Sequence, residues 1–363
     1  MSAVIQNDLK EPLLPKEENQ SAIQQSDSKN TSRIARFFGK YYLYTGIIVA
    51  LCYGSHNFFM YVSVGQALEL RMVFLIQIAN LIFYFMYHSL AAIESKRKYG
   101  SYWSKSRSAY FKDDGSLNGF VLFIVIIRSL LQYVVQYVLY YILETSVRSG
   151  VSNSIVLSIY GTTTILSAIA FYFLFNEKLG VRHIIGIAAV TLSIILIANG
   201  RYEVEGNSIS QNAGINEADR LSVLIPVALS LVNCCIFVIN TLITRVIKVS
   251  RLSIFQYASD TQFLNSLIFS LQALFQQLYG EQYTLYEFTM VFLSSLFQVF
   301  GQILFSGSAA YGKGSLIQAM IMIQSPFQLL LEIIFLQLYP ALMGVLGMIV
   351  CLLGTLFIIL TKK

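Results

Sequence analysis

Ten apolar runs divide the chain, and polar residues gather between them. The runs lie at about 41–64, 71–93, 118–142, 150–175, 181–199, 221–243, 253–279, 287–311, 315–338 and 341–360. Most are close to the roughly 20 residues that a helix needs to cross a hydrocarbon core. They lack the amphipathic period of helices on the surface of soluble proteins. The pattern therefore predicts an all-α polytopic membrane protein with ten transmembrane helices.

The composition agrees with this prediction. Of 363 residues, 56% are hydrophobic and 12% are charged, against roughly 25% charged in soluble domains. The four cysteines fall inside apolar runs without a metal-binding spacing, so we expect no cofactor and no metal. The net charge of +6 comes from basic residues between the runs. Such placement indicates membrane orientation rather than a nucleic-acid partner.

Lys and Arg distribute unequally over the two predicted sides of the membrane. If the N-terminus is cytosolic, most of the basic residues outside the runs lie on the cytosolic side. The other side holds Arg71, Arg148, Arg201 and Arg220. Because cytosolic loops carry an excess of Lys and Arg, we expect a multi-pass protein with both termini in the cytosol. The compartment stays open between the Golgi, other endomembranes and the plasma membrane.

The runs form two groups of five. The stretch 154–199, two apolar runs joined by a charged elbow at 176–182, is similar to 316–360, with Gly186 opposite Gly347. We expect a disordered cytosolic tail (1–40), a first five-helix repeat (41–199), a lumenal or extracellular linker (200–220) and a second repeat (221–363). Five is an odd number, so the second repeat must be inverted in the membrane. Inverted repeats are common in secondary transporters.

Several short motifs resemble the EamA-like repeat of the drug/metabolite transporter superfamily, which includes nucleotide-sugar carriers. Residues 51–59 (LCYGSHNFF) resemble its W-G-x-N-F opening, and Arg71 matches an arginine often found at the head of span two. Residues 173–179 (FLFNEKL), followed by Gly186, are similar to its helix–elbow–helix signature. Residues 240–245 and 325–326 also fit. The resemblance covers about 41–360 and implies a solute carrier with a central cavity.

The chain also departs from that pattern. The first half has Thr163 and Thr164 near the place of the span-four proline, and the second half has Gln337 near the place of the elbow glutamate. The glutamine–asparagine and glutamine–lysine signatures of nucleotide-sugar carriers are not evident. These differences leave the substrate open.

Polar side chains recur at four-residue spacing on three of the predicted spans. Ionisable groups inside a bilayer cost roughly 2.5–3.5 kcal/mol each on insertion scales, so they are candidates for function. Since residues four apart share a helix face, each stripe should face the protein interior. We expect substrate-binding residues in three stripes: Arg128, Gln132, Gln136 and Tyr140; Gln298 and Gln302, followed by Ser306; and Gln324, Gln328 and Glu332.

Each of these groups also has a structural interpretation. Arg128 either faces an anionic substrate or pairs with Glu332 or Asp260, and the glutamines either bind substrate or join helices. Glu332 and Asp260 are candidates for proton coupling, although a pair between Asp260 and Arg245 or Arg251 is favoured. For Glu177 a pair with Lys178 or Arg182, or a helix cap, is favoured.

The sequence thus predicts a secondary transporter for a small polar, anionic organic metabolite, nucleotide-sugar-like or related. A proton-coupled carrier of amines, amino acids or neutral metabolites is the alternative, as is a non-transporting membrane scaffold. No nucleophile, metal cluster or phosphate-binding loop indicates an enzyme. The expected partners are the small-molecule substrate and the lipid bilayer, and a homodimer is possible.

Overall fold

Helices make up nearly all of the described structure. The computed structural model describes residues 22–65, 70–112, 114–148, 159–160, 162–177, 180–199, 224–248, 250–337 and 342–360. Within these ranges the one β feature is an isolated bridge between Phe111 and Leu117. The helices are α2 (Ala22–Met60), α3 (Leu70–Leu75), α4 (Ile78–Tyr99), α5 (Gly119–Arg148), α7 (Thr162–Phe175), α8 (Val181–Asn199), α10 (Leu224–Ile243), α11 (Ile254–Tyr279), α12 (Leu285–Tyr311), α13 (Gly314–Ile321), α14 (Gln324–Leu336) and α15 (Leu342–Leu360). The all-α prediction is confirmed.

Short helical turns connect some of these elements. A π-helical turn (Tyr61–Gly65) follows α2, a 3-10 turn (Lys105–Arg107) lies in the loop after α4, and a longer one (Thr244–Lys248) follows α10. Local caps explain several boundaries. The Ser253 hydroxyl accepts a hydrogen bond from the Gln256 N–H at the start of α11, which satisfies one of the free donors of a first helical turn.

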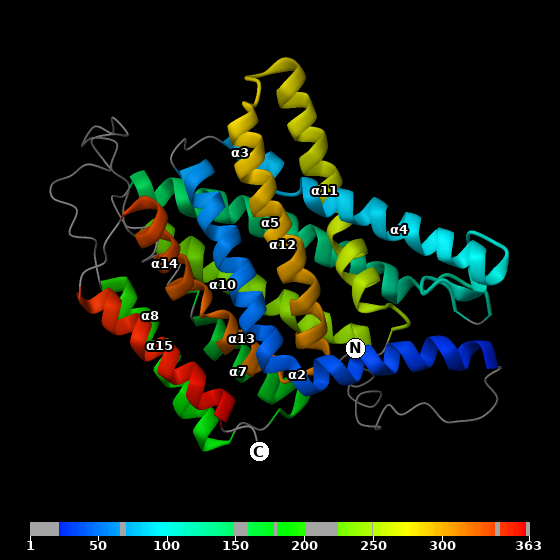
Figure 1. Cartoon of the computed structure of the whole chain (residues 1–363), viewed down its shortest axis with the longest axis horizontal. Coiled ribbons are helices and arrows are strands. Elements are labelled where there is room, and N and C mark those ends of the chain that lie inside the picture. Colours follow the sequence, from blue (N-terminus) through cyan, green and yellow to red (C-terminus); the bar gives the residue numbers. More distant parts are fainter. Residues whose placement is uncertain are drawn as a thin grey trace.

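The longest helix, α2, begins within the predicted tail. It runs from Ala22 and bends at Tyr41, where φ is −109° and ψ is 15°. Figure 1 shows its first part lying across one end of the bundle before the chain turns into the bundle. Residues 1–21 of the predicted tail and the predicted linker 200–220 lie outside the described residues.

Five of the described helical segments are long and apolar enough to cross a membrane. They are Leu70–Tyr99, Gly119–Ile142, Leu224–Ile243, Leu285–Tyr311 and Gly314–Leu336. Thr162–Phe175, Val181–Ser193 and Leu342–Phe357 are apolar but shorter. The remaining two predicted spans fall on α2 and α11, which carry more polar residues. The described helices are thus compatible with a membrane protein, and five rather than ten meet the criteria of length and composition.

Two of these segments are interrupted. Between α3 and α4 the chain turns at Ile76 and Gln77, and between α13 and α14 it turns at Met322 and Ile323. The N–H groups of Met322 and Ile323 bond the carbonyls three residues earlier, as in a tightened helix. Pro326 follows this second break. A proline has no N–H for the carbonyl four residues earlier, but that carbonyl, on Met322, accepts the Ser325 N–H at 3.2 Å instead.

The helix contacts follow a regular scheme. The α2 helix packs on α12, α13 and α14, and α10 packs on α5 and α7. Likewise α11 packs on α4 and α5, α12 also touches α3 and α4, α7 lies on α13, and α8 lies on α15. Figure 1 shows α8 and α15 side by side and α2 beside α12. The same contacts occur in the two groups of helices. If each member of one group is replaced by its counterpart in the other, the list of contacts stays the same. The counterparts are, in order, α2 and α10, α3–α4 and α11, α5 and α12, α7 and α13–α14, and α8 and α15.

Two residues with a left-handed backbone conformation occupy equivalent positions in the two groups of helices. Asn176 follows α7 with φ 52°, and Gln337 follows α14 with φ 55°. Within the described ranges they are the non-glycine residues with positive φ, a conformation that closes helices. Asn176 and Gln337 are as many residues apart in the sequence as Gly186 and Gly347. The first residues of α8 and α15 are the same distance apart.

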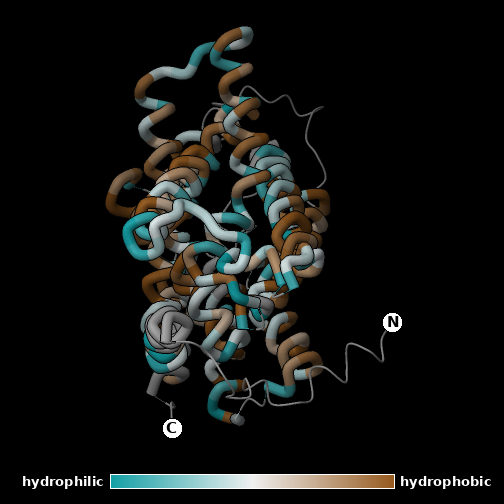
Figure 2. Tube along the Cα trace, turned by 90° about the vertical axis from the view of Figure 1, so that its right-hand side faces the viewer, coloured by the Kyte–Doolittle hydropathy of each residue, from teal (hydrophilic) through white to brown (hydrophobic). Residues whose placement is uncertain are grey.

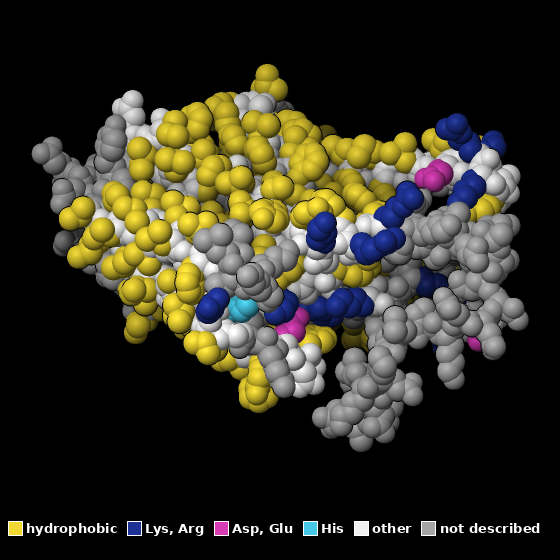
Figure 3. Space-filling view, turned by 60° about the horizontal axis from the view of Figure 1, so that its bottom comes forward, with side chains coloured by type: hydrophobic (Ala, Val, Ile, Leu, Met, Phe, Trp, Pro, Cys, Tyr) yellow, Lys and Arg dark blue, Asp and Glu magenta, His cyan; other side chains and the backbone are white. Residues whose placement is uncertain are grey.

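The outer surface is strongly apolar. Exposed side chains include Phe123, Phe173, Phe335 and Leu352, each more than half exposed. Figure 3 shows hydrophobic side chains over most of one face, with Lys and Arg toward one side of it. Figure 2 shows the hydrophilic turn between α11 and α12 above more hydrophobic helices. Apolar patches of this extent are typical of lipid-facing or protein-facing surfaces.

Lys and Arg side chains gather toward one end of the bundle (Figure 3), and we call it the basic end. A buried cluster joins the elements there: Phe38, Ala109, Val121, Val125, Ile247, Leu252, Ile254, Tyr257 and Ala310. At the opposite end Arg71, at the start of α3, pairs with Glu287 at 2.8 Å and Glu281 at 3.4 Å. The two ends are therefore closed by different contacts.

Candidate functional site

Arg128, on α5, is the largest fully buried side chain in the described structure and is 1% exposed. One guanidinium nitrogen, Nη1, donates to the Asn240 carbonyl at 2.5 Å, to Thr244 Oγ1 at 2.5 Å and to the Tyr257 hydroxyl at 2.9 Å. The guanidinium also lies 5.0 Å from the centre of the Tyr257 ring. These partners are neutral, and neither Glu332 nor Asp260 forms an ion pair with Arg128. Of the two alternatives for Arg128, the pair with Glu332 or Asp260 is therefore not observed.

Further buried polar atoms lack hydrogen bonds on Arg128 itself, on its contact residue Asn240 and on α12. Among the described residues no partner is found for Arg128 Nε, for either atom of the Asn240 side-chain amide, for Gln302 Nε2 or for Ser306 Oγ. The Gln302 carbonyl oxygen accepts from the Tyr53 hydroxyl at 3.2 Å, and Arg128 is within electrostatic range of Tyr53. Buried polar groups normally find partners, so unpaired ones mark a place where a ligand or water can bind.

These residues define what we call the Arg128 cluster: Tyr53, Arg128, Asn240, Thr244, Tyr257 and Gln302, together with Ser306, which lies about one helical turn after Gln302 on α12. They come from α2, α5, α10 with its following turn, α11 and α12, so both halves of the chain contribute. Aromatic rings lie beside them, with Phe305 6.5 Å from Tyr53 and 6.1 Å from Phe237 between ring centres. The cluster combines one cation, free amide and hydroxyl groups, and aromatic faces.

The rest of the α5 stripe is also buried. Gln132 is 9% exposed and Gln136 is 2% exposed, and Gln136 Oε1 has no hydrogen-bond partner among the described residues. Tyr140 belongs to an apolar cluster with Met60 and Phe269. The stripe thus changes from polar to apolar along α5, away from Arg128.

On α12, Gln298 contacts the break between α3 and α4. Its side-chain oxygen accepts from Gln77 Nε2 at 3.1 Å and from Asn80 Nδ2 at 3.4 Å. The Ala79 N–H donates to Ser295 Oγ at 3.0 Å. Sequence reasoning missed Gln77 and Asn80. Two amides three residues apart in an apolar run were the available signal.

The third predicted stripe forms a contact within its own helix. Gln328 Nε2 donates to Glu332 Oε1 at 2.8 Å, and both side chains are buried. Gln324 is half-buried at the first position of α14, directly after the break. The three stripes therefore contact different neighbours. The α5 stripe contacts α10 and α11, the α12 stripe contacts α2 and the break between α3 and α4, and the α14 stripe makes its contact within α14.

Asp260 forms a second polar centre. His88 Nε2 lies 2.6 Å from Asp260 Oδ1, and the Tyr110 hydroxyl donates to Asp260 Oδ2 at 2.5 Å. The expected pair with Arg245 or Arg251 is therefore wrong, because α11 turns Asp260 toward α4 and the loop after it. The partners come from distant parts of the chain, which local spacing cannot indicate.

Glu177 also has a distant partner. It forms an ion pair with Arg245, and it lies 3.5 Å from the Gly314 N–H and 3.4 Å from Ser315 Oγ. The favoured pair with Lys178 or Arg182 is not observed: Lys178 lies outside the described residues and Arg182 is exposed. Glu177 thus joins α7 to the turn after α10 and to the start of α13.

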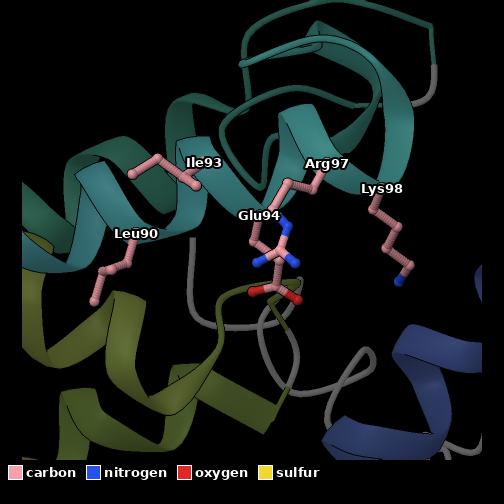
Figure 4. A pocket seen from close by; sticks show the side chains of 5 residues that line it. All are labelled: Leu90, Ile93, Glu94, Arg97 and Lys98. Carbon is pink, nitrogen blue, oxygen red and sulfur yellow. The ribbon is translucent and has the colours of Figure 1, made fainter.

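A surface hollow lies away from these groups. It has a volume of about 600 Å³ and is lined by Leu90, Ile93, Glu94, Arg97 and Lys98, all on α4 (Figure 4). The hollow is open and sits near the basic end, so it does not coincide with the Arg128 cluster. No group of three or more His, Cys, Asp or Glu that could hold a metal ion occurs in the described part of the chain.

Comparisons with known proteins add information on the fold. No protein-family model and no curated protein matches the chain. Among solved structures, 28 chains are similar. One of them, described as "Crystal structure of protein", covers 88% of this chain and 98% of its own length with a TM-score of 0.59 at 11% identity. That likeness shows a shared overall fold.

Proposed function

We propose that the chain is a secondary transporter that moves a small polar, anionic organic metabolite, nucleotide-sugar-like or related, by alternating access. The observation that carries this proposal is the buried Arg128, whose charge is held by neutral groups alone. A buried cation without a carboxylate is costly unless an anion binds beside it. The free atoms of Asn240, Gln302 and Ser306 offer the remaining hydrogen bonds to such a solute.

The proposed architecture is ten spans in two inverted five-helix halves, with both termini cytosolic. Its support is the contact scheme that maps onto itself and the paired left-handed caps at Asn176 and Gln337. Two related halves would produce both features. In such carriers the substrate site lies between the halves near the membrane midplane, and the Arg128 cluster draws residues from both halves.

The test is uptake of labelled anions by the full chain in liposomes. The panel comprises nucleotide sugars, sugar phosphates and dicarboxylates, with neutral sugars and amino acids for comparison. Arg128→Gln should lower anion uptake by at least about tenfold, equivalent to roughly 1.4 kcal/mol of lost binding. Arg128→Lys, which keeps the charge, should retain part of the uptake. The matched control is Arg33→Gln, because Arg33 is exposed.

Arg128→Gln also removes structural hydrogen bonds, so a second variant is needed. The Asn240 side chain makes no hydrogen bond in the described structure, and Asn240→Ala should therefore fold normally and yet reduce uptake. Anions that bind should raise the thermal stability of the natural chain by mass action, and raise that of Arg128→Gln less. Unchanged anion uptake in both variants would refute the proposed site.

A further inference from the structure

One exposed face of α4 changes from apolar to basic toward the end of the helix. Its apolar members, each more than half exposed, are Ile82, Met86, Leu90 and Ile93. Arg97 follows at the same spacing and is also exposed. Intervals of three and four residues place these five side chains on one helix face, whereas a different face of α4 packs on α11. The structure thus presents an apolar stripe that ends at a cation.

The length of this stripe agrees with the thickness of a lipid leaflet. From Ile82 to Ile93 a helix rises about 16 Å, and half of a hydrocarbon core is about 15 Å. Arg71, at the other end of the same candidate span, and Arg97 would lie about 39 Å apart on a continuous helix. A bilayer with its headgroups is about 40–45 Å thick. In a membrane-embedded chain, Arg97 therefore lies at the level of the lipid headgroups.

The open hollow on α4 lies beside the end of the stripe. Leu90 and Ile93 form the apolar part of its lining, and Figure 4 shows both beside the charged part. The charged part consists of Glu94, Arg97 and Lys98. Two cations and one carboxylate give the lining a net positive charge. An apolar surface next to a positively charged one matches a molecule that carries a hydrocarbon chain and a phosphate.

We propose that this hollow binds one anionic phospholipid. An acyl chain follows the stripe past Leu90 and Ile93, and the headgroup phosphate lies beside Arg97 and Lys98. A guanidinium suits this role because it binds a phosphate through two parallel hydrogen bonds. Zwitterionic lipid surrounds any membrane-embedded chain, so the property that the hollow adds is a preference for a negatively charged headgroup.

The loop after α4 fixes further cations at this end of the helix. Lys96 Nζ donates to the Tyr102 hydroxyl at 2.7 Å and lies 4.4 Å from the centre of its ring. The centre of the Tyr99 ring lies 4.0 Å from the Arg107 guanidinium and 5.1 Å from Lys98 Nζ. Contacts between a cation and a ring hold the charge in place without neutralising it. Together these cations favour an anionic headgroup over a zwitterionic one.

The same cations also have a structural interpretation. Lys96, Arg97 and Lys98 occupy the last turn of α4, where positive charge stabilises a helix end and sets the orientation in the membrane. Neither role requires a cation on the same face as the apolar stripe. The two interpretations differ in what they predict for a cation outside the hollow. Lys112, which is exposed in the loop after α4, is such a cation.

The place of binding is tested by photo-crosslinking of the purified full chain in phosphatidylcholine nanodiscs. The probe is phosphatidylinositol with a diazirine in one acyl chain, since this lipid is anionic and has no cationic group. Adducts should concentrate on the tryptic peptide 72–96, which contains Leu90 and Ile93. Unlabelled phosphatidylinositol should compete, and additional phosphatidylcholine should not. Equal competition by the two lipids, or adducts spread evenly over the other helices, overturns the proposal.

The role of the charges is tested by native mass spectrometry of phosphatidylinositol bound to variants in detergent micelles. Arg97→Gln should weaken binding about fivefold, and its combination with Lys98→Gln more than about tenfold, because each basic residue near a membrane surface contributes a factor of that size. Glu94→Gln should strengthen binding, because it removes the carboxylate from the hollow. The matched control Lys112→Gln should change the affinity less than about twofold. Equal weakening by Lys112→Gln and Arg97→Gln shows diffuse attraction and overturns the site.

A soluble headgroup distinguishes a lipid site from a site for a free phosphate. Glycerophosphoinositol carries the same phosphate and inositol without acyl chains, and it should not displace phosphatidylinositol at equal concentration. Displacement by glycerophosphoinositol or by inorganic phosphate assigns the hollow to a soluble anion and overturns the lipid site. Lipid binding rests on the membrane embedding of α4 and not on transport, so a failed uptake screen does not affect this test.

Discussion

Glu177, at the end of the first half's fourth predicted span, forms an ion pair with Arg245, which follows the first helix of the second half. Their side chains are 13% and 9% exposed. Arg245 also donates to the Ala310 carbonyl at 3.2 Å, so one pair joins α7, the turn after α10 and the end of α12. The basic end of the bundle is closed across the two halves by this contact.

Removal of one partner from this pair should be strongly destabilising. Glu177→Gln and Arg245→Gln leave an uncompensated charge in a mostly buried place, and each should cost about 3 kcal/mol. The double variant should cost less than the sum of the two. The measurement is equilibrium unfolding of the purified chain in mixed detergent. Arg182→Gln is the control and should change stability by less than about 0.5 kcal/mol; equal losses in control and test variants would contradict the pairing.

Gly354 should tolerate no larger side chain. A Cβ at this position would lie 2.9 Å from the Ala189 Cβ and 3.2 Å from the Gly186 carbonyl oxygen, between α15 and α8. Gly354→Val should therefore separate the two helices and cost roughly 1–3 kcal/mol. Gly119→Val is the control, because a Cβ at Gly119 meets no atom within 4 Å. The same unfolding assay distinguishes them, and equal stabilities would refute the close approach.

Replacement of Glu287 should lower the stability more than replacement of Glu281, although both residues pair with Arg71. Glu287 closes a capping box with Thr284 at the start of α12, and its side chain is 18% exposed. Glu287→Ala should cost about 1–2 kcal/mol through loss of the cap and the ion pair. Glu281 is 77% exposed, and Glu281→Ala should cost less than about 0.5 kcal/mol, as is common for surface pairs. The reverse order would show that the cap does not stabilise α12.

The proposed orientation can be checked by thiol labelling. In a chain without its four cysteines, a single cysteine at Arg107 should react with an impermeant reagent from the cytosolic side alone. A cysteine at Glu281 should react from the other side alone, because the turn between α11 and α12 lies at the opposite end of the bundle (Figure 1). Labelling of both positions from one side would rule out the orientation.

The sequence was most informative where apolar length and local repetition decide structure. Long apolar runs form helices because internal hydrogen bonds satisfy the backbone, and the alignment of Gly186 with Gly347 agrees with the matching bounds of α8 and α15. The breaks at Gln77 and at Met322 could not be read, since an apolar run stays apolar across a break. Pro326 lies close to the second break, where the Met322 carbonyl is bonded to the Ser325 N–H.

Partner choice was beyond the reach of sequence reasoning. Asp260 and Glu177 have nearby basic residues in sequence, yet their partners are His88 and Arg245. Helix rotation and packing decide which face of α11 turns toward α4, and neither is encoded in local spacing. Arg128 was identified because a lone cation in an apolar run is costly, whereas its neutral partners emerge from three-dimensional packing.

The matching caps at Asn176 and Gln337 have an energetic consequence. In a carrier built from two identical halves, the state closed at one end and the state closed at the other end would have equal free energy. Here the backbone turns agree, but Glu177 and its ion pair follow the first cap alone, since the second half has no carboxylate at the end of α14. For a carrier of the proposed kind, Glu177 and Arg245 hold the basic end closed while Arg71 and Glu287 hold the opposite end, so the two closed states differ in the ion pair that must break before transport.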